Sequence, residues 1–127
     1  MIFGIGSDVV KIARIVHLYD NYGQKFLMKI LSEAEQKIFS GFSLKSRRMS
    51  YLAKRFAAKE ALVKALGTGF REDITFTSIS IYNNHLGRPE ISYDHNIASR
   101  LPENAKVMLS LSDEDDVVVA FAIIEVM

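Results

Sequence analysis

The segment from Lys54 to Gly69 restricts the fold of this chain most strongly, because it combines a strong helix pattern with one unexpected charge. Ala, Leu, Lys, Glu and Arg dominate the segment, and neither Gly nor Pro interrupts it before Gly67. At about 100° per residue, one side of the predicted helix is apolar and comprises Met49, Leu52, Ala53, Phe56 and Val63. Glu60 falls in the middle of that side. A carboxylate that faces a protein core is unfavourable unless another group compensates its charge.

Three explanations of Glu60 are open from the sequence. Lys64 follows four residues later on nearly the same face of the helix, where it could form a semi-buried ion pair with Glu60. A metal ion could bind the carboxylate instead. The third explanation is that this face of the helix lines a groove and not the core. The helix is predicted to end at Gly67, Thr68 and Gly69, because Gly readily adopts the left-handed conformation that ends helices.

Length and composition limit the classes of protein to consider. A chain of 127 residues is expected to form a single domain with its own hydrophobic core. Hydrophobic residues make up 49% of it and charged residues 24%, as in ordinary globular proteins. The absence of cysteine excludes disulfides, a thiolate nucleophile and a zinc–thiolate site. No apolar run approaches the ~18 residues of a membrane span, and no signal-peptide pattern is present, so we expect a cytoplasmic protein.

Charge is distributed unevenly along the chain. Residues 1–70 contain 12 Lys/Arg against 5 Asp/Glu, whereas residues 71–127 contain 4 against 10. Between Lys45 and Lys64 there are seven basic residues, and Glu60 is the only acid. This pattern is typical of a solvated helix face, and it also suits a phosphate-bearing ligand or an acidic protein partner. Nucleic acid is not the expected partner, because the chain as a whole is not strongly basic.

A second unexpected acid lies near the N-terminus. Residues 2–10 are short and mainly apolar, which predicts a buried strand. Gly4 and Gly6 lack side chains and would let another backbone or a ligand come close. Asp8 interrupts the apolar pattern directly after them. It either caps the helix that follows or has a role in a site.

The other elements follow from periodicity and turn signals. Ser32 and Glu35 have the spacing of a capping box, which predicts a short helix from there through Phe39. The remaining predictions are a helix from residue 12 to beyond 26 with a break at 21–23, strands over 74–76 and 79–81 with a bulge near 77–78, a turn at 83–87, an edge strand over 89–93, a short helix over 94–101 and a final hairpin of 107–112 and 117–126.

Asp8 and Glu60 together narrow the chemistry. Two carboxylates from separate elements, without a cluster of His or Cys, suit a hard ion such as Mg²⁺, which commonly binds one or two carboxylates plus substrate phosphates. Arg55, Lys64 and the backbone N–H groups of Gly67, Thr68 and Gly69 would then supply positive potential for those phosphates. These residues do not by themselves specify a reaction.

Two long motifs carry a resemblance to a known family. The first is Gly4-Ile5-Gly6-Ser7-Asp8-Val9-Val10 with Ile12-Ala13-Arg14-Ile15. The second is Arg55-Phe56-Ala57-Ala58-Lys59-Glu60-Ala61 with Lys64-Ala65-Leu66-Gly67-Thr68-Gly69. In this order they resemble the signature of the holo-acyl carrier protein synthases, which are small 4′-phosphopantetheinyl transferases. The turn Leu86-Gly87-Arg88-Pro89 and the final hairpin also fit, so the resemblance spans nearly the whole chain.

The resemblance implies a fold and a reaction. The fold is α+β, a single compact domain over residues 1–127 in which a mostly antiparallel sheet packs against one long helix and shorter helices. The reaction moves the 4′-phosphopantetheine group of coenzyme A onto a serine hydroxyl of an apo acyl carrier protein, releases adenosine 3′,5′-bisphosphate and prepares the carrier for fatty acid biosynthesis. The family is commonly homotrimeric, with active sites between neighbouring subunits.

The resemblance also implies roles for individual residues. Asp8 and Glu60 match the magnesium ligands, and Lys64 matches a phosphate-binding lysine. Arg55 and the Gly67–Gly69 segment lie in the coenzyme A motif. Arg14 lies on the helix that the family uses to bind its acidic carrier protein, and Lys25 and Lys29 extend that basic face. For the base that takes the serine proton, we favour a water held by Asp8 or Glu60.

One position departs from the family pattern. Many members have a histidine after the Ser-x-Ser of the penultimate strand, where this chain has Asp113, so the contact of that histidine with coenzyme A phosphate is not expected here. Two rival functions are open beside the transferase. One is a non-catalytic oligomeric module that binds a nucleotide-like ligand, and the other is a Mg²⁺-dependent pyrophosphatase that needs no protein acceptor.

Overall fold

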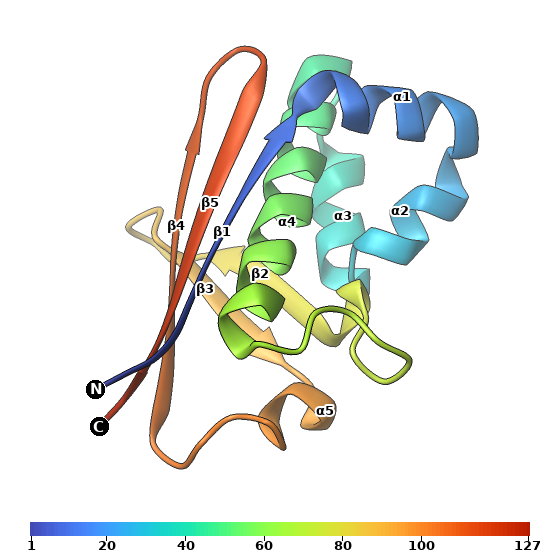
Figure 1. Ribbon diagram of the computed structural model, residues 1–127. Coiled ribbons are helices and arrows are strands. Elements are labelled where there is room, and N and C mark those ends of the chain that lie inside the picture. Colours follow the sequence, from blue (N-terminus) through green and yellow to red (C-terminus); the bar gives the residue numbers. More distant parts are fainter.

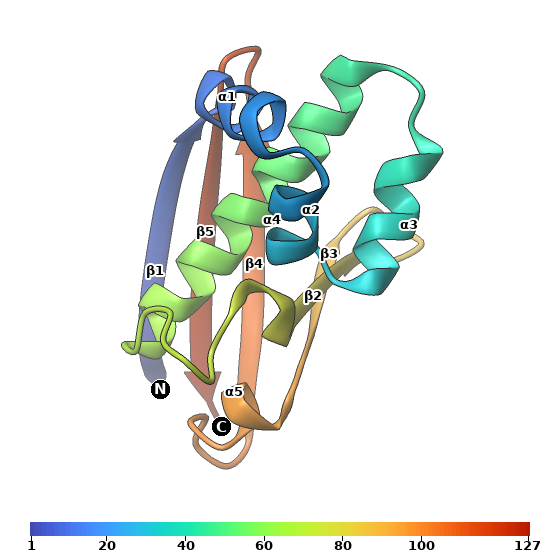
Figure 2. The ribbon, with the colours of Figure 1, turned by 90° about the vertical axis from the view of Figure 1, so that its right-hand side faces the viewer.

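An antiparallel three-stranded sheet supports one long helix, and three shorter helices cover the other side of that helix (Figure 1). In this computed structural model, which describes residues 1–127, the strand order is β1-β5-β4. The strands are β1 (Ile2–Lys11), β4 (Ala105–Asp113) and β5 (Val117–Val126). Helix α4 (Lys45–Leu66) packs along β1 and β5. Figure 2 shows α4 lying against this sheet, and both chain termini are at the same end of the molecule.

The remaining elements surround α4. Helices α1 (Ile12–Tyr22), α2 (Gln24–Ile30) and α3 (Glu33–Gly41) lie on the side of α4 away from the sheet. A 3₁₀ turn (Phe76–Ser78) leads into a separate two-stranded sheet of β2 (Ile79–Asn83) and β3 (Pro89–Tyr93), which is followed by α5 (His95–Ala98). None of the helices combines the length and the apolar composition that crossing a membrane requires.

Gly4 and Gly6 allow the backbones of β1 and α4 to come into contact. A Cβ atom on Gly4 would overlap with the carbonyl oxygen of Ala65, and one on Gly6 would overlap with the carbonyl oxygen of Ala61. On Gly6, the added Cβ would also lie 2.7 Å from the backbone nitrogen of Ala65. The close approach that the sequence predicted is therefore between strand and helix. No side chain larger than hydrogen fits at either glycine without moving α4.

Helix α4 is buried around most of its circumference and not along one stripe. Its buried residues include Met49, Leu52, Ala53, Phe56 and Val63, as predicted, but also Arg55 and Lys59. The reason is its central position, with the sheet on one side and α1 to α3 on the other. The sequence predicted one apolar side, which is the pattern of a helix at the protein surface. Helix α4 instead has two packed faces.

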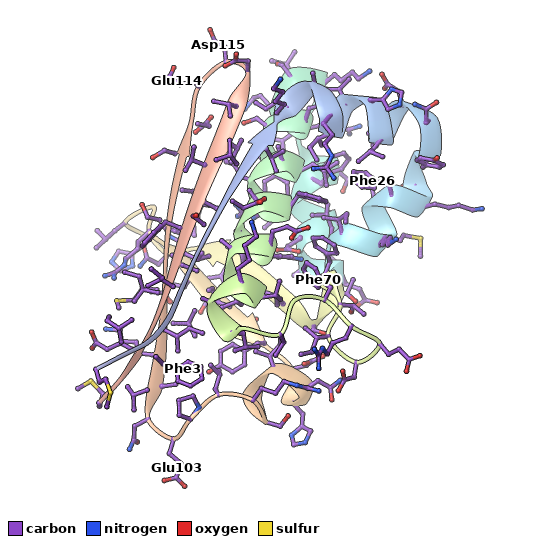
Figure 3. The ribbon with its side chains drawn as sticks, viewed as in Figure 1. Phe3, Phe26, Phe70, Glu103, Glu114 and Asp115 are labelled. Atoms are coloured by element: carbon purple, nitrogen blue, oxygen red, sulfur yellow. The ribbon has the colours of Figure 1, made fainter.

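Several local predictions are confirmed. Gly23 separates α1 from α2 with a φ of 53°, and Ser32 with Glu35 forms the capping box at the start of α3. Pro89 begins β3, and the acidic tip of the β4–β5 hairpin follows Asp113. Glu114 and Asp115 are labelled at that tip in Figure 3.

Two local predictions are wrong, and one open alternative is excluded. Residues 74–76 do not form a strand, because Thr75 caps the 3₁₀ turn that precedes β2. Strand β1 is not buried, since it is an edge strand and only its α4-facing side is covered: Ile5 is 60% exposed and Val9 63%. Asp8 does not cap α1, because it lies within β1 and the helix begins after Lys11 without a side-chain cap.

The glycine contact yields a stability test. We expect Gly6→Ala to lower the free energy of unfolding by at least about 1–3 kcal/mol, the usual cost of overpacking, because the new methyl group meets helix backbone that has no rotamer to change. Denaturant unfolding measures this loss. Gly41→Ala is the matched control, since no atom lies within 4 Å of its added Cβ. A Gly6→Ala protein as stable as Gly41→Ala would contradict the close approach.

Candidate active site

Asp8 lies on the side of β1 that faces α4. Successive side chains of a strand alternate between its two faces, so Gly4, Gly6, Asp8 and Val10 share one face. Gly6 and Val10 are buried, and the side chain of Asp8 is only 16% exposed. The two glycines therefore bring α4 against the strand, and Asp8 is the first side chain beyond them that meets the helix.

Lys64 pairs with Asp8 and not with Glu60. Its Nζ lies 3.2 Å from Oδ1 of Asp8 and donates a hydrogen bond of 3.0 Å to the carbonyl oxygen of Ser7. Glu60 forms no ion pair within 4 Å with any basic group, which excludes the first explanation of its position. Lys64 remains 51% exposed and can still reach a ligand.

The carboxylates of Asp8 and Glu60 lie near enough to repel each other, and the nearby basic groups do not fully compensate this repulsion and the burial of Glu60. Burial raises the pKa of the Glu60 carboxyl above its ordinary value, and the negative charge of Asp8 raises this pKa further. Lys64 and Arg14 oppose both effects. Oδ2 of Asp8 is buried and has no hydrogen-bond partner. A buried acceptor without a donor is unfavourable, so this arrangement suits a cation.

The donor set fits Mg²⁺. Both groups are carboxylates, the hard oxygen ligands that this ion prefers, and the orphaned Oδ2 offers a free lone pair. The chain has no group of three or more His, Cys, Asp or Glu side chains placed to hold a metal ion. Two carboxylates are nevertheless sufficient for Mg²⁺, which usually retains waters and completes its coordination with substrate phosphates.

An apolar cavity of about 380 Å³ lies beside Glu60. Its walls come from α1, α2, α4 and the 3₁₀ turn, and they include Leu18, Tyr22, Phe26, Ile30, Phe56 and Phe76. Lys25 and Lys29 also line it, and Arg14 lies over the ring of Phe56 at 5.5 Å. Figure 3 labels Phe26 on α2 and Phe70 in the loop after α4. Glu60 therefore lines a groove, as the third explanation proposed, and it shares this groove with two lysines.

The Gly67–Gly69 segment mainly completes α4. The N–H of Gly67 donates to the carbonyl oxygens of Val63 and Lys64, and the N–H of Gly69 donates to that of Val63. Both glycines have positive φ, 83° and 64°. Of the three backbone amides expected to meet phosphate, only that of Thr68 has no acceptor within the chain. The other two already satisfy the end of the helix.

Arg55 lines a different cavity. This cavity, of about 330 Å³, also contains Arg47, Lys54 and Asn83. The guanidinium of Arg55 is buried over the ring of Tyr51 at 4.4 Å, and its Nε has no hydrogen-bond partner. Within one chain, Arg55 therefore does not share the Glu60 cavity. Lys54 pairs with Asp113 at 3.3 Å, so the departure from the family pattern places a negative charge beside this basic cavity.

Sequence reasoning missed a buried ion pair. Lys59 is fully buried, and its Nζ lies 2.6 Å from Oε1 of Glu35. Burial lowers the pKa of Lys59, and the charge of Glu35 opposes that effect. The sequence contains a weak signal of it, because Lys59 is spaced three residues after Phe56 and four before Val63, within the apolar pattern of α4.

Comparisons with known proteins agree with this geometry. A family model described as the 4′-phosphopantetheinyl transferase superfamily matches residues 4–122. A holo-[acyl-carrier-protein] synthase from Neisseria meningitidis is 45% identical over 127 residues, covering 98% of this chain and 99% of that protein. One from Wolbachia pipientis is 44% identical over 124 residues and 98% of both chains. The chain belongs to the 4′-phosphopantetheinyl transferase superfamily. Within it, the chain is a transferase of the holo-[acyl-carrier-protein] synthase type.

Solved structures show the same fold. The crystal structure of the synthase from N. meningitidis aligns with a TM-score of 0.89 at 43% identity, covering 98% of this chain and 99% of that one. The synthase from Bacillus anthracis, solved in complex with CoA (3′,5′-ADP), aligns with a TM-score of 0.86 at 34% identity and covers 100% and 99%. The predicted α+β fold, with an antiparallel sheet packed on one long helix, is confirmed.

The environment of Glu60 yields a second stability test. A raised pKa in the folded state means that ionised Glu60 opposes folding, and this cost grows as the pH rises from the unfolded-state pKa to the folded-state pKa. Without metal at neutral pH, Glu60→Gln should therefore melt at or above the wild-type temperature, and the difference should vanish at acidic pH. Calorimetry in a chelator measures both. Glu33→Gln, which changes an exposed acid, is the control. A lower melting temperature at neutral pH would contradict the charge imbalance.

Proposed function

We propose that this chain transfers the 4′-phosphopantetheine group from coenzyme A to a serine hydroxyl of an apo acyl carrier protein and releases adenosine 3′,5′-bisphosphate. The observation that carries the proposal is the juxtaposition of Asp8, Glu60 and Lys64, with Glu60 lining an apolar cavity that Lys25 and Lys29 also line. The names of the relatives and the coenzyme A complexes of the B. anthracis and Helicobacter pylori synthases support it. The carrier would serve fatty acid biosynthesis. Residues 1–127 would form one transferase domain, and the cytoplasmic location stays a prediction.

Asp8 and Glu60 would hold one Mg²⁺ ion. The unpaired Oδ2 of Asp8 and the raised pKa of Glu60 support this assignment. When bound, the ion would neutralise charge on the pyrophosphate of coenzyme A, which lowers the barrier for attack at phosphorus. Both carboxylates would then be ionised, because a nearby cation favours their charged form.

The reaction exchanges the phosphoanhydride bond of coenzyme A for a phosphoester bond to the carrier. The serine oxygen of the carrier forms a bond to the phosphorus that bears the pantetheine arm, and the bond from that phosphorus to the bridging pyrophosphate oxygen breaks. The adenosine bisphosphate leaves with the bonding electrons. Lys64, half exposed beside Asp8, would donate to a phosphate oxygen as negative charge shifts to the leaving group. A water held by Asp8 or Glu60 would accept the serine proton.

Coenzyme A would bind between two copies of the chain. Arg55 belongs to the site by resemblance, but within one chain it lines a cavity separate from that of Glu60. A neighbouring copy that presented its Arg55 cavity would bring both sets of residues to one ligand. The uncovered face of the three-stranded sheet offers a surface for such contact, because it exposes Phe3, Ile5, Val9, Val119 and Phe121. Exposed apolar patches of this kind mark interaction sites.

The acyl carrier protein would dock on the basic face of α1 and α2. Lys25 and Lys29 line the cavity beside Glu60, and Arg14 lies over the ring of Phe56, which also lines it. An acidic helical partner would find complementary charge on this face, close to the reacting groups. The serine of the carrier would then reach the phosphorus from the side of the cavity.

The decisive experiment is intact-mass measurement of an apo acyl carrier protein after incubation with this chain, coenzyme A and Mg²⁺. A gain equal to the phosphopantetheine group, with stoichiometric release of adenosine 3′,5′-bisphosphate, supports the proposal. A pyrophosphatase would cleave coenzyme A without the carrier and leave its mass unchanged. A binding module would bind coenzyme A and change neither molecule.

Loss of either carboxylate should abolish transfer without unfolding the protein. We expect Glu60→Gln and Asp8→Asn each to reduce kcat/KM by at least about a hundredfold, the upper range for disrupting the surroundings of a metal ligand. The double variant should lose little more, because both residues would serve one ion. Transfer assays across a Mg²⁺ titration measure this, with partial recovery at high Mg²⁺. A Glu60→Gln protein that transfers at the wild-type rate would exclude Glu60 as a ligand.

Reversing charge on the docking face should affect one substrate selectively. Arg14→Glu is expected to raise the KM for the carrier protein much more than the KM for coenzyme A, and added salt should reduce the difference. Lys37→Glu, an exposed change on α3 outside the Glu60 cavity, is the control. If the carrier KM of Arg14→Glu equals that of wild type at low salt, this face is not the interface.

The protein should form a homotrimer in solution. Light scattering at micromolar concentration is expected to give three times the mass of 14.3 kDa. Phe121→Lys, on the uncovered face of β5, should dissociate the assembly and abolish transfer, whereas Ile38→Lys, an equally exposed apolar position on α3, should leave it intact. A stable monomer with full activity would count against a site shared between copies.

A further inference from the structure

The buried pair of Lys59 and Glu35 is the one charged cluster in the core that the proposed reaction does not use. The two side chains are 0% and 1% exposed. Burying two charges is costly, and apolar replacements of such pairs are often equally stable. Stability is therefore a weak reason to keep the pair, and its contacts indicate another role.

Four elements meet at this pair. Nζ of Lys59 in α4 donates to Oε1 of Glu35 at 2.6 Å and to the carbonyl oxygen of Ile30, the last residue of α2, at 2.7 Å. The Oε1 atom of Glu35 also accepts the N–H of Ser32 at 2.9 Å, and its Oε2 accepts the N–H of Ile81 in β2 at 2.8 Å. One ion pair thus connects α2, α3, α4 and β2.

The bond from Lys59 to Ile30 fixes one wall of the Glu60 cavity against the other. Helix α2 contributes Phe26, Lys29 and Ile30 to that cavity, and α4 contributes Phe56 and Glu60. The last carbonyl groups of a helix have no partner within it, and here the ammonium of Lys59 supplies one. Because Lys59 directly precedes Glu60, the same segment of α4 holds α2 and presents the carboxylate.

We propose that Lys59 and Glu35 are positioning residues that set the distance between α2 and Glu60, and thereby the place where the carrier protein meets the reacting groups. This inference rests on the proposed function, because it assigns the α2 face to the carrier. Lys59 lies under the docking face and contacts neither substrate. Its loss should therefore change carrier use while leaving coenzyme A use nearly unchanged.

Two variants separate positioning from stability. Lys59→Met keeps the length of the side chain, removes the donor to Ile30 and leaves Glu35 as an unpaired buried charge, so it should also melt at a lower temperature. The double variant Lys59→Met/Glu35→Gln removes that charge. Its Gln oxygen can still accept the N–H of Ser32 in the capping box, but the N–H of Ile81 loses its acceptor. The double variant should therefore regain part of the melting temperature, while the carbonyl of Ile30 still lacks its donor.

The experiment measures the KM for carrier and for coenzyme A, the melting temperature and the hydrogen exchange of residues 24–30. We expect both variants to raise the carrier KM about tenfold, which is within the range of typical couplings between two sites. The KM for coenzyme A should change less than about twofold, which is below that range. Amides of α2 should exchange faster in both. Lys45→Met is the control, since it removes an exposed pair between α4 and Asp20 of α1.

Two results would overturn the inference. One is a double variant that regains the wild-type carrier KM together with its stability, and the other is an α2 that exchanges at the wild-type rate in both variants. If the wild-type chain does not transfer at all, the proposed function fails instead, and the exchange of α2 still tests whether Lys59 holds that helix. If Lys59→Met does not fold, the double variant carries both measurements.

Discussion

The backbone contact between β1 and α4 is the constraint on which the rest of the structure depends. Because Gly4 and Gly6 have no side chains, Ala61 and Ala65 can bring the helix directly against the strand. This contact fixes the position of α4 along the direction of β1, and it therefore determines which residues of the helix lie beside Asp8. The contact also places Lys64 beside Asp8, because the Cβ of Lys64 lies directly against Gly6. A side chain at either glycine would separate the two elements that supply the charged groups.

The site that results is electrostatically incomplete. Asp8 has one cationic partner for two carboxylate oxygens, Glu60 has none, and burial already disfavours its charge. A protein selected for stability alone would replace one acid or add a base. The imbalance is tolerable because the site is open to a cavity that ligands can enter, and a cation with a phosphate-bearing substrate would restore neutrality. Uncompensated charge and a shifted pKa of this kind are typical of functional sites.

Local patterns allowed much of the fold to be predicted, and the failures have a common cause. The capping box at Ser32, the break at Gly23 and the final hairpin depend on residues close in sequence, and all three are confirmed. The buried β1 and the strand at 74–76 are wrong, and the Glu60–Lys64 pair, one of three explanations of Glu60, is excluded, because long-range packing decides all three. Asp8 and Glu60 could be selected as unexpected acids, but their proximity follows from the fold. The Lys59–Glu35 pair joins residues 24 positions apart, so the spacing of Lys59 within the apolar pattern of α4 can mark the buried lysine but cannot reveal its partner.

Helix α4 carries charged residues into several different environments, and this arrangement is the reason for proposing a site shared between copies of the chain. Glu60 lines a cavity formed with α1 and α2, Lys64 extends from the edge of β1, and Arg55 lies in a separate basic cavity with Asn83. A ligand as long as coenzyme A has phosphates at one end and a reacting phosphorus in its middle, so it needs positive charge at more than one point. Within one chain, Arg55 and Glu60 line separate cavities. Two copies can offer both residues to one ligand, if the Arg55 cavity of one faces the carboxylates of the other, and the uncovered apolar face of the sheet gives them a surface on which to associate.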